Sequence, residues 1–347
     1  MEAAVAGAAA DAADEYALGV DSGGSGVRVA LTPVKTGTPD GTVTYASPPV
    51  VSDVPVPTGP AGIDADGMAA QLVPAARELL ARTGGGQLAA VCVGAAGMAT
   101  LGDDLRARLP GVLAEEFGVR RVALAADAVT AYAGALGQRP GAVVAAGTGL
   151  IGVGTDLTVW RRADGWGHLL GDCGGGAWIG RAGLEAAMRA HDGRAGGSAA
   201  LLRRLEAVFG SAAELPGLLY PRTDRPAVLA AFAPEVAACA AEGDPVAEGV
   251  LRDAARHIAE SAAAVCPPPG AGATPEVALT GGLLKLGEPL LVPLHEEFVR
   301  ALPLARRVEA LGSPLDGALV IAAALATDNL SFPYDPRMLC VFGHQTR

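Results

Sequence analysis

Aromatic side chains, clustered basic residues and long apolar runs are scarce or missing in this chain of 347 residues. Aromatics make up 4% of the residues, and the net charge is −11, with no group of Lys and Arg residues to offset it locally. An acidic surface of this kind repels nucleic acid and anionic membranes, so neither is expected as a partner. No apolar run reaches the roughly 18 residues that a membrane-spanning helix needs.

The five cysteines are widely separated, and none belongs to a CxxC pair. This spacing argues against zinc and iron–sulfur sites. An odd number of scattered cysteines is typical of reduced thiols, so a cytoplasmic location is expected. Residues 1–15 carry Glu2 and Asp11 but no basic residue, which predicts a disordered lead-in rather than a signal peptide.

A chain of this length, with half its residues apolar, is too long for one small core and is predicted to form two domains. The first domain is expected over residues 16–137 and the second over residues 138–315. Strand-like runs and helical segments alternate through the first half, as in α/β proteins. Residues 316–326 are a candidate helix to return to the first domain, and residues 327–347 form a tail without clear periodicity.

Apolar periodicity and breaks at glycine or proline give the expected elements. Strands are predicted over residues 16–20, 27–31, 88–93, 122–124, 142–146, 150–153 and 277–280. Helices are predicted over residues 66–82, 103–117 with an interruption around Pro110, 128–136, 180–191, 199–209, 225–242 with breaks, and 245–266. The proline-rich residues 48–60 are expected to form a loop or an edge strand.

Two segments share one pattern, in which a Gly-rich turn with hydroxyl residues joins two apolar runs. The first turn spans Asp21–Gly26 and the second spans Gly147–Gly149. Glycine lets backbone N–H groups approach phosphate oxygens closely, and Ser22, Ser25 and Thr148 add hydroxyl donors. The repetition predicts a duplicated domain with one phosphate-binding hairpin in each copy. The alternative is that a Gly-rich chain forms such turns by chance.

The second turn also matches the GxGxxG fingerprint of dinucleotide-binding proteins, over Gly147-Thr148-Gly149-Leu150-Ile151-Gly152. That fingerprint requires a helix to follow, whereas residues 151–155 are β-prone, so a Rossmann site is not expected. The P-loop pattern GxxxxGK[ST] does not occur in the sequence. The two turns are therefore interpreted as phosphate-binding hairpins.

Two aspartates stand at the ends of predicted strands. Asp21 follows the first strand, where a carboxylate can hold Mg²⁺ directly or through water, although it could also be a simple turn residue. Asp127 starts a predicted helix and is a candidate general base that takes the proton from an attacking hydroxyl. An N-cap role would also explain Asp127. Because catalysis of phosphoryl transfer is mostly positioning, one such carboxylate and Mg²⁺ would suffice.

The segment from Asp164 to Gly176 combines many glycines with Trp166, His168 and Asp172. Glycines let backbone groups approach sugar hydroxyls, and a carboxylate accepts two hydroxyl donors, so the segment is typical of a polyol pocket. Trp166 could instead belong to the core, and His168 could be a structural histidine. Cys173 has no base assigned to it and is not expected to be a nucleophile.

A double glycine, Gly281-Gly282, ends the strand predicted over residues 277–280. It would permit close approach of an adenine or ribose ring, and a simple turn is the equal alternative.

The order of these motifs resembles that of the BadF/BadG/BcrA/BcrD ATPase family, and within it the N-acetylglucosamine kinases. The matching motifs are Asp21-Ser22-Gly23-Gly24-Ser25, Asp127, Gly147-Thr148-Gly149, Gly165-Trp166-Gly167 through Gly171-Asp172, and Thr280-Gly281-Gly282. The resemblance runs from about Leu18 to Ala326. The two hairpins specify only the wider actin/hexokinase-like superfamily, whereas the Gly-Trp-Gly and Gly-Asp segment is more specific to this branch.

The resemblance implies an α/β, two-domain, actin-like (ribonuclease H-like) ATPase fold with ATP in the cleft between the domains. It implies a kinase that uses ATP and Mg²⁺ to phosphorylate the 6-hydroxyl of a small sugar, N-acetylglucosamine or glucosamine, with Asp127 as the base and Asp21 at the metal. The other expected contacts are with phosphate at Ser22, Gly23, Gly24, Ser25, Gly147, Thr148 and Gly149, with the sugar at Asp127, Gly165, Trp166, Gly167, His168 and Asp172, and with adenosine at Gly281 and Gly282.

Three positions depart from the family's usual residues. Cys173-Gly174-Gly175 stands where Glu-Gly-Ser is usual, Leu150 stands where Ser or Asn is common, and Pro57-Thr58-Gly59-Pro60 lacks an expected Asn. These changes remove polar groups near the expected sugar, so the 2-position could carry an acetamide or a free amine. Asp172 could pair with an ammonium, which would favour glucosamine.

Three other functions are alternatives: a kinase of another small hydroxyl compound, an ATPase that activates a partner enzyme, and a non-catalytic sugar-sensing regulator. The activator would need clustered cysteines, and the regulator would need a DNA-binding helix-turn-helix and a basic patch. This sequence supplies neither feature. The protein could be a monomer or a homodimer, and the sequence does not distinguish the two.

Overall fold

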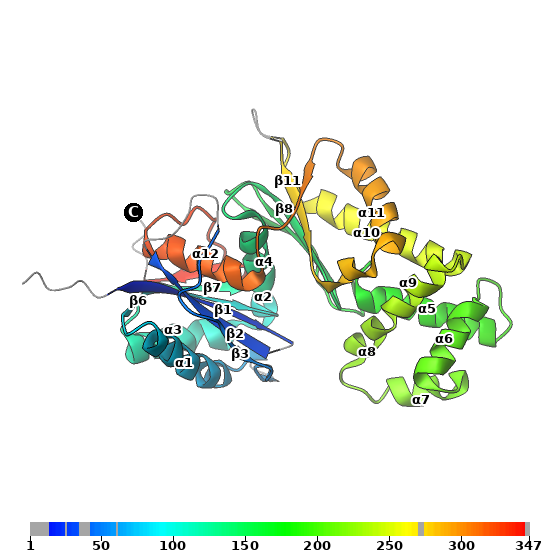
Figure 1. Cartoon of the computed structure of the whole chain (residues 1–347), viewed down its shortest axis with the longest axis horizontal. Helices are drawn as coiled ribbons and strands as arrows, with labels where there is room; N and C mark the ends of the chain where they lie inside the picture. The colour runs from blue at the N-terminus through cyan, green and yellow to red at the C-terminus, as the bar shows by residue number, and fades with distance from the viewer. Residues whose placement is uncertain (1–13, 25, 35–41, 60–61, 270–273, 344–347) are drawn as a thin grey trace, which may run out of the picture. The chain divides into compact units, whose positions relative to one another are not determined.

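The computed structural model describes residues 14–24, 26–34, 42–59, 62–269 and 274–343. The chain divides into two compact units (Figure 1). Unit 1 comprises residues 1–137 and 312–347, and unit 2 comprises residues 138–311. The helix that follows unit 2 in the sequence thus belongs to unit 1.

Unit 1 is built on a six-stranded sheet with the order β13-β7-β6-β1-β2-β3. Strands β1 and β2 form an antiparallel hairpin, whereas β1, β6 and β7 run parallel to one another. The short edge strand β3 lies in the proline-rich region. The strand bounds are β1 Glu15–Gly23, β2 Gly26–Pro33, β3 Val50–Ser52, β6 Gln87–Ala95, β7 Val122–Ala126 and β13 Leu339–Phe342, and a separate two-stranded ladder joins β4 Thr58–Gly59 to β5 Gly62–Ile63.

Helices cover both faces of this sheet (Figure 1). Helices α1 and α3 contact each other and α1 contacts β2, while α12 contacts β1 and α4. Their bounds are α1 Ala65–Arg82, α2 Met98–Leu101, α3 Asp103–Phe117, α4 Asp127–Leu136 and α12 Pro314–Ala326. The predicted interruption at Pro110 is wrong, because α3 is continuous through it and buries Leu105, Leu109 and Leu113 along one face. Packing of this face outweighs the backbone hydrogen bond that proline removes.

Helices α4 and α12 touch through their backbones at two glycines. A Cβ atom on Gly317 would lie 1.8 Å from the carbonyl oxygen of Thr130, and one on Gly134 would lie 2.0 Å from that of Ser313. Only glycine allows so close a crossing. Ser313 begins α12 with a capping box in which its hydroxyl and the Asp316 carboxylate satisfy each other's backbone N–H groups.

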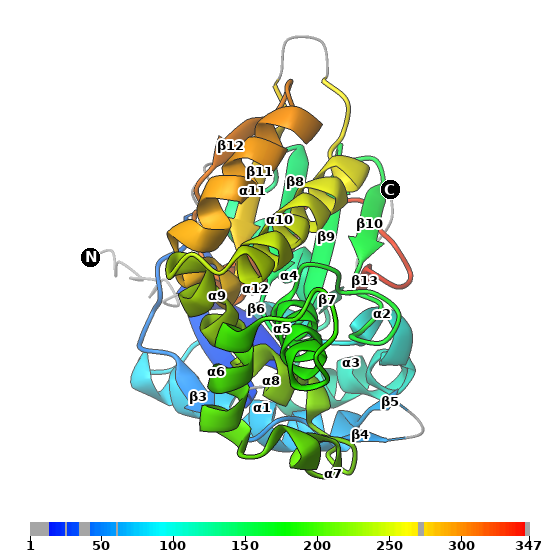
Figure 2. The same cartoon turned by 90° about the vertical axis from the view of Figure 1, so that its right-hand side faces the viewer.

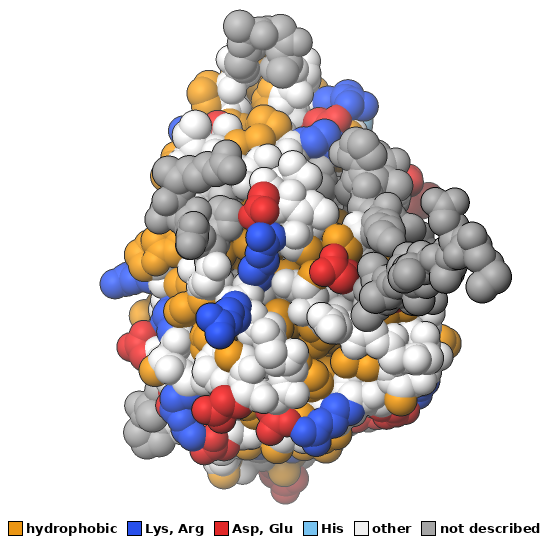
Figure 3. All heavy atoms as spheres, turned by 90° about the vertical axis from the view of Figure 1, so that its left-hand side faces the viewer, with side chains coloured by type: hydrophobic (Ala, Val, Ile, Leu, Met, Phe, Trp, Pro, Cys, Tyr) orange, Lys and Arg blue, Asp and Glu red, His pale blue; other side chains and the backbone are white. Residues whose placement is uncertain are grey.

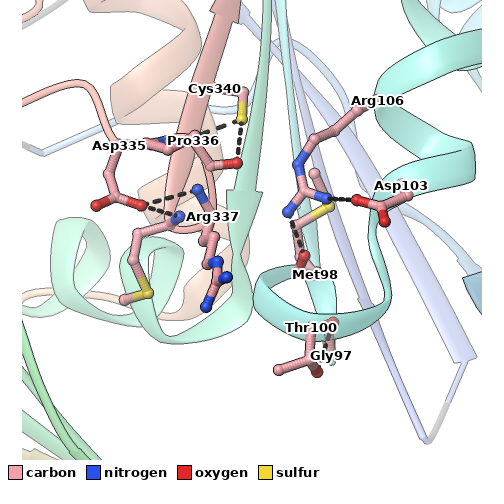
Figure 4. Close-up of polar contacts among 10 residues, drawn as sticks. Gly97, Met98, Thr100, Asp103, Arg106, Asp335, Pro336, Arg337 and Cys340 are labelled. Atoms are coloured by element: carbon pink, nitrogen blue, oxygen red, sulfur yellow. Dashed lines mark hydrogen bonds and ion pairs between the residues drawn. The ribbon is translucent and has the colours of Figure 1, made fainter.

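The tail after residue 327, for which the sequence shows no periodicity, carries the last strand of unit 1. Strand β13 pairs antiparallel with β7, and the carboxylate of Asp335 shapes the preceding turn by accepting the N–H groups of Arg337 and Met338 at 2.8 Å each (Figure 4). The Cys340 thiol donates to the carbonyl of Pro336 at 3.0 Å. Burial raises the pKa of this thiol, which therefore stays protonated. A four-residue strand is too short to show a period, so only its pairing with β7 reveals it.

Unit 2 contains a five-stranded sheet with the order β10-β9-β8-β11-β12. It also starts from an antiparallel hairpin, β8–β9, and β8 runs parallel to β11 and β11 to β12. The bounds are β8 Gly141–Ala146, β9 Leu150–Thr155, β10 Trp160–Asp164, β11 Glu276–Thr280 and β12 Arg306–Val308. The two sheets therefore share a hairpin followed by parallel strands.

Helix α10 packs on this sheet by contacting β8, β9 and β10, and it also contacts α5, α9 and α11 (Figure 2). The helices are α5 Gly176–His191, α6 Ala199–Phe209, α7 Leu215–Leu219, α8 Arg225–Ala231, α9 Ala233–Ala241, α10 Pro245–Val265 and α11 Glu288–Ala301. The predictions over residues 199–209 and 245–266 agree closely with α6 and α10. Helix α5 starts four residues before its predicted beginning, within the glycine run 174–176.

None of the helices in the described part of the chain is both long enough and apolar enough to cross a bilayer. On the face drawn in Figure 3, acidic and basic side chains are intermixed rather than separated by sign.

Candidate functional site

Two of the predicted functional aspartates lie on one edge of the sheet in unit 1. Asp21 pairs with Gly94 of β6, and Gly94 pairs with Ala125 of β7, two residues before Asp127. Because β1, β6 and β7 are parallel, their carboxyl ends meet at the same edge, and one strand separates the two carboxylates. Two interstrand spacings correspond to roughly 10 Å. This edge is the usual place for ligands in open α/β sheets.

The carboxylate of Asp21 is mostly buried beside Arg28. Arg28 Nη1 lies 3.2 Å from Asp21 Oδ2. Burial raises the pKa of Asp21, and the charge and hydrogen bond of Arg28 offset only part of that effect. A further cation at this carboxylate would lower its pKa. Mg²⁺ is commonly held by one or two carboxylates together with substrate phosphates, so Asp21 fits a magnesium ligand.

The turn after Asp21 presents open backbone. Gly23 pairs with Gly26, and a Cβ atom on Gly23 or Gly24 would meet no atom within 4 Å. Ser22 is only 5% exposed, and its carbonyl accepts the Ala96 N–H at 2.9 Å, which ties the end of β1 to the end of β6. Ser25, the other predicted hydroxyl donor, lies outside the described residues.

Asp127 is the first residue of α4, and the N-cap is Ala126, so the predicted N-cap role for Asp127 is wrong. Asp127 Oδ1 accepts the Ala128 N–H at 2.9 Å. The backbone carbonyl of Asp127 accepts the Thr130 hydroxyl, also at 2.9 Å. The positive end of the helix dipole favours an ionised carboxylate here. The carboxylate is thus tied to the first turn of α4.

The second hairpin in unit 2 is fastened to the start of α5. Ala146 pairs with Leu150, which leaves Gly147–Gly149 as the turn, and the Gly147 N–H donates to the Gly149 carbonyl at 2.9 Å. The N–H groups of Gly176 and Ala177 donate to the carbonyls of Gly147 and Thr148 at 2.8 Å each. The turn is therefore fixed by the helix that follows the predicted sugar segment.

That segment is organised by Asp164, which the sequence analysis did not single out. Asp164 Oδ1 accepts the N–H of Asp172, and Oδ2 accepts the N–H of Cys173 at 3.0 Å. A Cβ atom on Gly171 would lie 2.4 Å from Asp164 Oδ1, so a larger residue there would displace the Asp164 carboxylate. The sequence did hold a signal for Asp164 as an acceptor of loop N–H groups, because it is an aspartate directly before a Gly-rich segment.

Asp172 faces the second hairpin. A Cβ atom on Gly149 would lie 2.3 Å from Asp172 Oδ2, and Asp172 Oδ1 accepts the Gly167 N–H at 3.0 Å. The backbone of Asp172 has a φ of 55°, a left-handed conformation that is strained for a residue with a side chain. Burial, with a smaller contribution from the Asp164 charge, raises the pKa of Asp172, although hydrogen bonds to the carboxylate offset part of this rise.

Trp166 and His168 lie at the surface of the same segment. Trp166 is 60% exposed, so the alternative that it belongs to the core is wrong. The guanidinium of Arg162, another residue not singled out earlier, stands 4.5 Å from the centre of the indole ring and donates to the carbonyls of Asp164 and Gly165. The contact holds a flat aromatic surface toward solvent. His168 is partly buried and lines a cavity between helices.

The predicted adenosine contact lies next to the second hairpin. Gly281 follows β11, and a Cβ atom on it would lie 2.1 Å from the carbonyl oxygen of Ala146, the last residue of β8. Its φ of 106° is accessible to glycine. Unit 2 thus brings together Gly147–Gly149, Gly165–Asp172 and Gly281-Gly282, three segments widely separated in the sequence.

Two of the residues that depart from the family pattern, Leu150 and Cys173, differ from each other in burial. Leu150 is 2% exposed and belongs to the core of unit 2, so its side chain does not face a polar ligand. Cys173 is partly buried, and burial raises the pKa of its thiol. Within the part of the chain that the structure describes, no three His, Cys, Asp or Glu side chains are grouped as a metal cluster would require.

We expect Asp164→Ala to loosen the predicted sugar segment, because the N–H groups of Asp172 and Cys173 lose their acceptor. Hydrogen bonds to a charged group contribute about 1.5–3 kcal/mol each, so exchange of these two amide protons should accelerate at least about tenfold. Hydrogen exchange of residues 165–173 measures this. Asp164→Asn, which keeps one acceptor oxygen, should show an intermediate effect, and unchanged exchange in both variants would contradict the role of Asp164.

Comparison with known proteins identifies relatives. The model of the BadF/BadG/BcrA/BcrD ATPase family matches residues 18–322. The N-acetylmuramic acid/N-acetylglucosamine kinase of Clostridium acetobutylicum is 28% identical over 183 residues, which make up 52% of this chain and 58% of that protein. The match therefore spans less than two thirds of the length of this curated relative.

Solved structures resemble almost the whole chain. A proposed N-acetylglucosamine kinase from Chromobacterium violaceum has a TM-score of 0.63 and 28% identity, with 90% of this chain and 98% of that chain covered. A ROK family glucokinase from Streptomyces griseus, in complex with glucose and AMPPNP, has a TM-score of 0.51 and 22% identity, with 90% and 99% covered. These likenesses confirm the predicted α/β, actin-like fold class.

Proposed function

Because the chain belongs to the BadF/BadG/BcrA/BcrD ATPase family, we propose that it is an ATP-dependent kinase of an amino sugar. The acceptor is the 6-hydroxyl of N-acetylglucosamine or glucosamine. Two relatives that are 28% identical, one curated and one solved, are named as N-acetylglucosamine kinases, the curated one acting on N-acetylmuramic acid as well.

One observation in unit 2 carries the proposal. The Gly147–Gly149 hairpin and Asp172 of the sugar segment are in contact, although more than twenty residues separate them in the sequence. A phosphate-binding turn and a polyol-binding carboxylate need to be neighbours in a sugar kinase, because the transferred phosphoryl group must reach the sugar. The hairpin is hydrogen-bonded to the start of α5, and the N–H of Asp172 is hydrogen-bonded to Asp164, so each of the two neighbours is held in place.

The proposed reaction needs few groups. The carboxylate of Asp127 takes the proton from the sugar 6-hydroxyl as the new O–P bond forms and the bond between the γ-phosphorus and the β,γ-bridging oxygen breaks, releasing ADP. Backbone N–H groups at Gly23, Gly24, Thr148 and Gly149 hold phosphate oxygens. Gly281-Gly282 gives close approach for adenosine. Mg²⁺, when bound at Asp21, would neutralise charge on the phosphates.

Asp172 bears on which amino sugar is the acceptor. Its pKa is raised because the carboxylate is partly buried and lies near Asp164. A cationic ammonium group beside it would relieve both effects, whereas an acetamide would donate only one neutral N–H group. Asp172 therefore favours glucosamine over N-acetylglucosamine, and the two sugars should be compared directly as acceptors.

Release of ADP, measured with a coupled enzyme assay, tests the function. We expect glucosamine or N-acetylglucosamine to accelerate ADP release at least about tenfold over the rate without sugar, because binding of an acceptor closes the site and completes its catalytic groups, whereas hydrolysis in the open site is slow. The 6-deoxy analogue of the active sugar is the matched control and should not accelerate it.

Two outcomes would count against the proposal. Equal ADP release with and without every sugar would favour an ATPase that activates a partner. Acceleration by plain hexoses but by neither amino sugar would favour a kinase of a different small hydroxyl compound.

A further inference from the structure

A cavity in unit 2 lies apart from the Gly147–Gly149 hairpin of the same unit. Its volume is about 750 Å³, within the range that accommodates small organic ligands. Its walls come from α5, α7, α8, residues 168–169, Arg194 and Tyr220, and the three helices lie at the same end of unit 2 in both views (Figures 1 and 2). None of Gly147–Gly149 or Gly281-Gly282 lines it.

Four arginines line this cavity against a single carboxylate, in a chain whose net charge is −11. They are Arg181, Arg189, Arg194 and Arg225. Arg181 lies 3.5 Å from Glu185, one turn further along α5. Among the described residues, no carboxylate lies within 4 Å of the other three guanidinium groups, whose positive charge is therefore available to a ligand.

Backbone contacts place two of these arginines. Arg225 Nη1 donates to the carbonyl of Tyr220 at 2.8 Å, and Arg189 Nη1 lies 3.5 Å from the carbonyl of Ala195. Each contact uses one of the five N–H donors of a guanidinium group, so donors are left for an oxyanion. Arginine binds carboxylate and phosphate groups through paired donors.

Most of the rest of the cavity wall is apolar. Leu184 and Met188 lie on the same face of α5 as Arg181 and Glu185, at helical spacing. Leu215 of α7 also lines the wall and, like Leu184, is buried. A ligand that satisfies both kinds of wall carries an anionic group and an apolar body.

We propose that this cavity binds a small organic anion, a phosphorylated or carboxylated compound with an apolar portion. The arginines hold the oxyanion, and the wall formed by Leu184, Met188 and Leu215 covers the apolar portion. The ligand would also contact His168 and Leu169, which belong to the segment proposed to bind the sugar.

Calorimetric titration with phenyl phosphate, phenylacetate and benzyl alcohol tests this site without ATP or sugar, so its outcome is independent of the kinase activity. We expect the protein to bind at least one of the two anions, and to bind neutral benzyl alcohol at least about tenfold more weakly. The tighter anion shows whether the site prefers phosphate or carboxylate.

The double variant Arg189→Gln/Arg194→Gln should bind the preferred anion about tenfold more weakly, because two charged guanidinium groups are lost. The matched control, Arg203→Gln/Arg307→Gln, removes two exposed arginines of unit 2 outside the cavity and should stay within about twofold. If the first variant does not fold, Arg194→Gln alone should still weaken binding about threefold. Absence of anion binding in the wild type, equal binding of benzyl alcohol, or equal affinity of cavity and control variants would overturn the proposal.

Discussion

Asp127→Asn should lower kcat for sugar phosphorylation by about 10²–10⁴-fold, the usual contribution of a general base, while ATP binding stays within about twofold. Asparagine keeps an oxygen that can accept the Ala128 N–H, which the Asp127 carboxylate now accepts at 2.9 Å, so the start of α4 should be preserved. It loses the ability to take up a proton. The coupled ADP assay measures kcat, and calorimetric titration measures nucleotide affinity.

The matched control for this variant is Asp103→Asn. Asp103 is also the first residue of a helix in unit 1, but it begins α3 and its partner is Arg106, at 2.8 Å. We expect this variant to retain full activity. Wild-type kcat in Asp127→Asn would remove Asp127 from the mechanism, and an equal loss in both variants would assign the effect to helix stability.

Gly317→Ala should destabilise unit 1 by about 2–4 kcal/mol, although alanine is the better helix former. The added Cβ atom would lie 1.8 Å from the carbonyl oxygen of Thr130, so α12 must move away from α4. For a unit of this size, each kcal/mol corresponds to about 2–4 °C in Tm. Thermal unfolding followed by circular dichroism measures the change.

Gly111→Ala provides the comparison, because Gly111 also lies inside a helix of unit 1 and a Cβ atom there would meet nothing within 4 Å. Helix propensity should make this variant slightly more stable than the wild type, by up to about 1 kcal/mol. A Gly317→Ala protein as stable as Gly111→Ala would show that the close crossing of α4 and α12 is not required.

The sequence contained enough information for the hairpins and the aspartates at strand ends. Glycine turns between β-prone runs depend on local backbone preferences, so both hairpins could be located from the sequence alone. The first turn was predicted too long, because β1 continues through Asp21 and Ser22 to Gly23. Helices α6 and α10 were similarly predictable, because their apolar periodicity and caps are local.

The sequence by itself therefore determined many of the strands and helices and the two Gly-rich turns, and it located Asp127 at the start of a helix. Only the tertiary structure decided which of these segments meet. The contact of Gly149 with Asp172, the role of Asp164 and the pairing of β13 with β7 all join residues far apart along the chain, as does the cavity lined by four arginines. Local preferences carry no information about such contacts, because these depend on how whole elements pack.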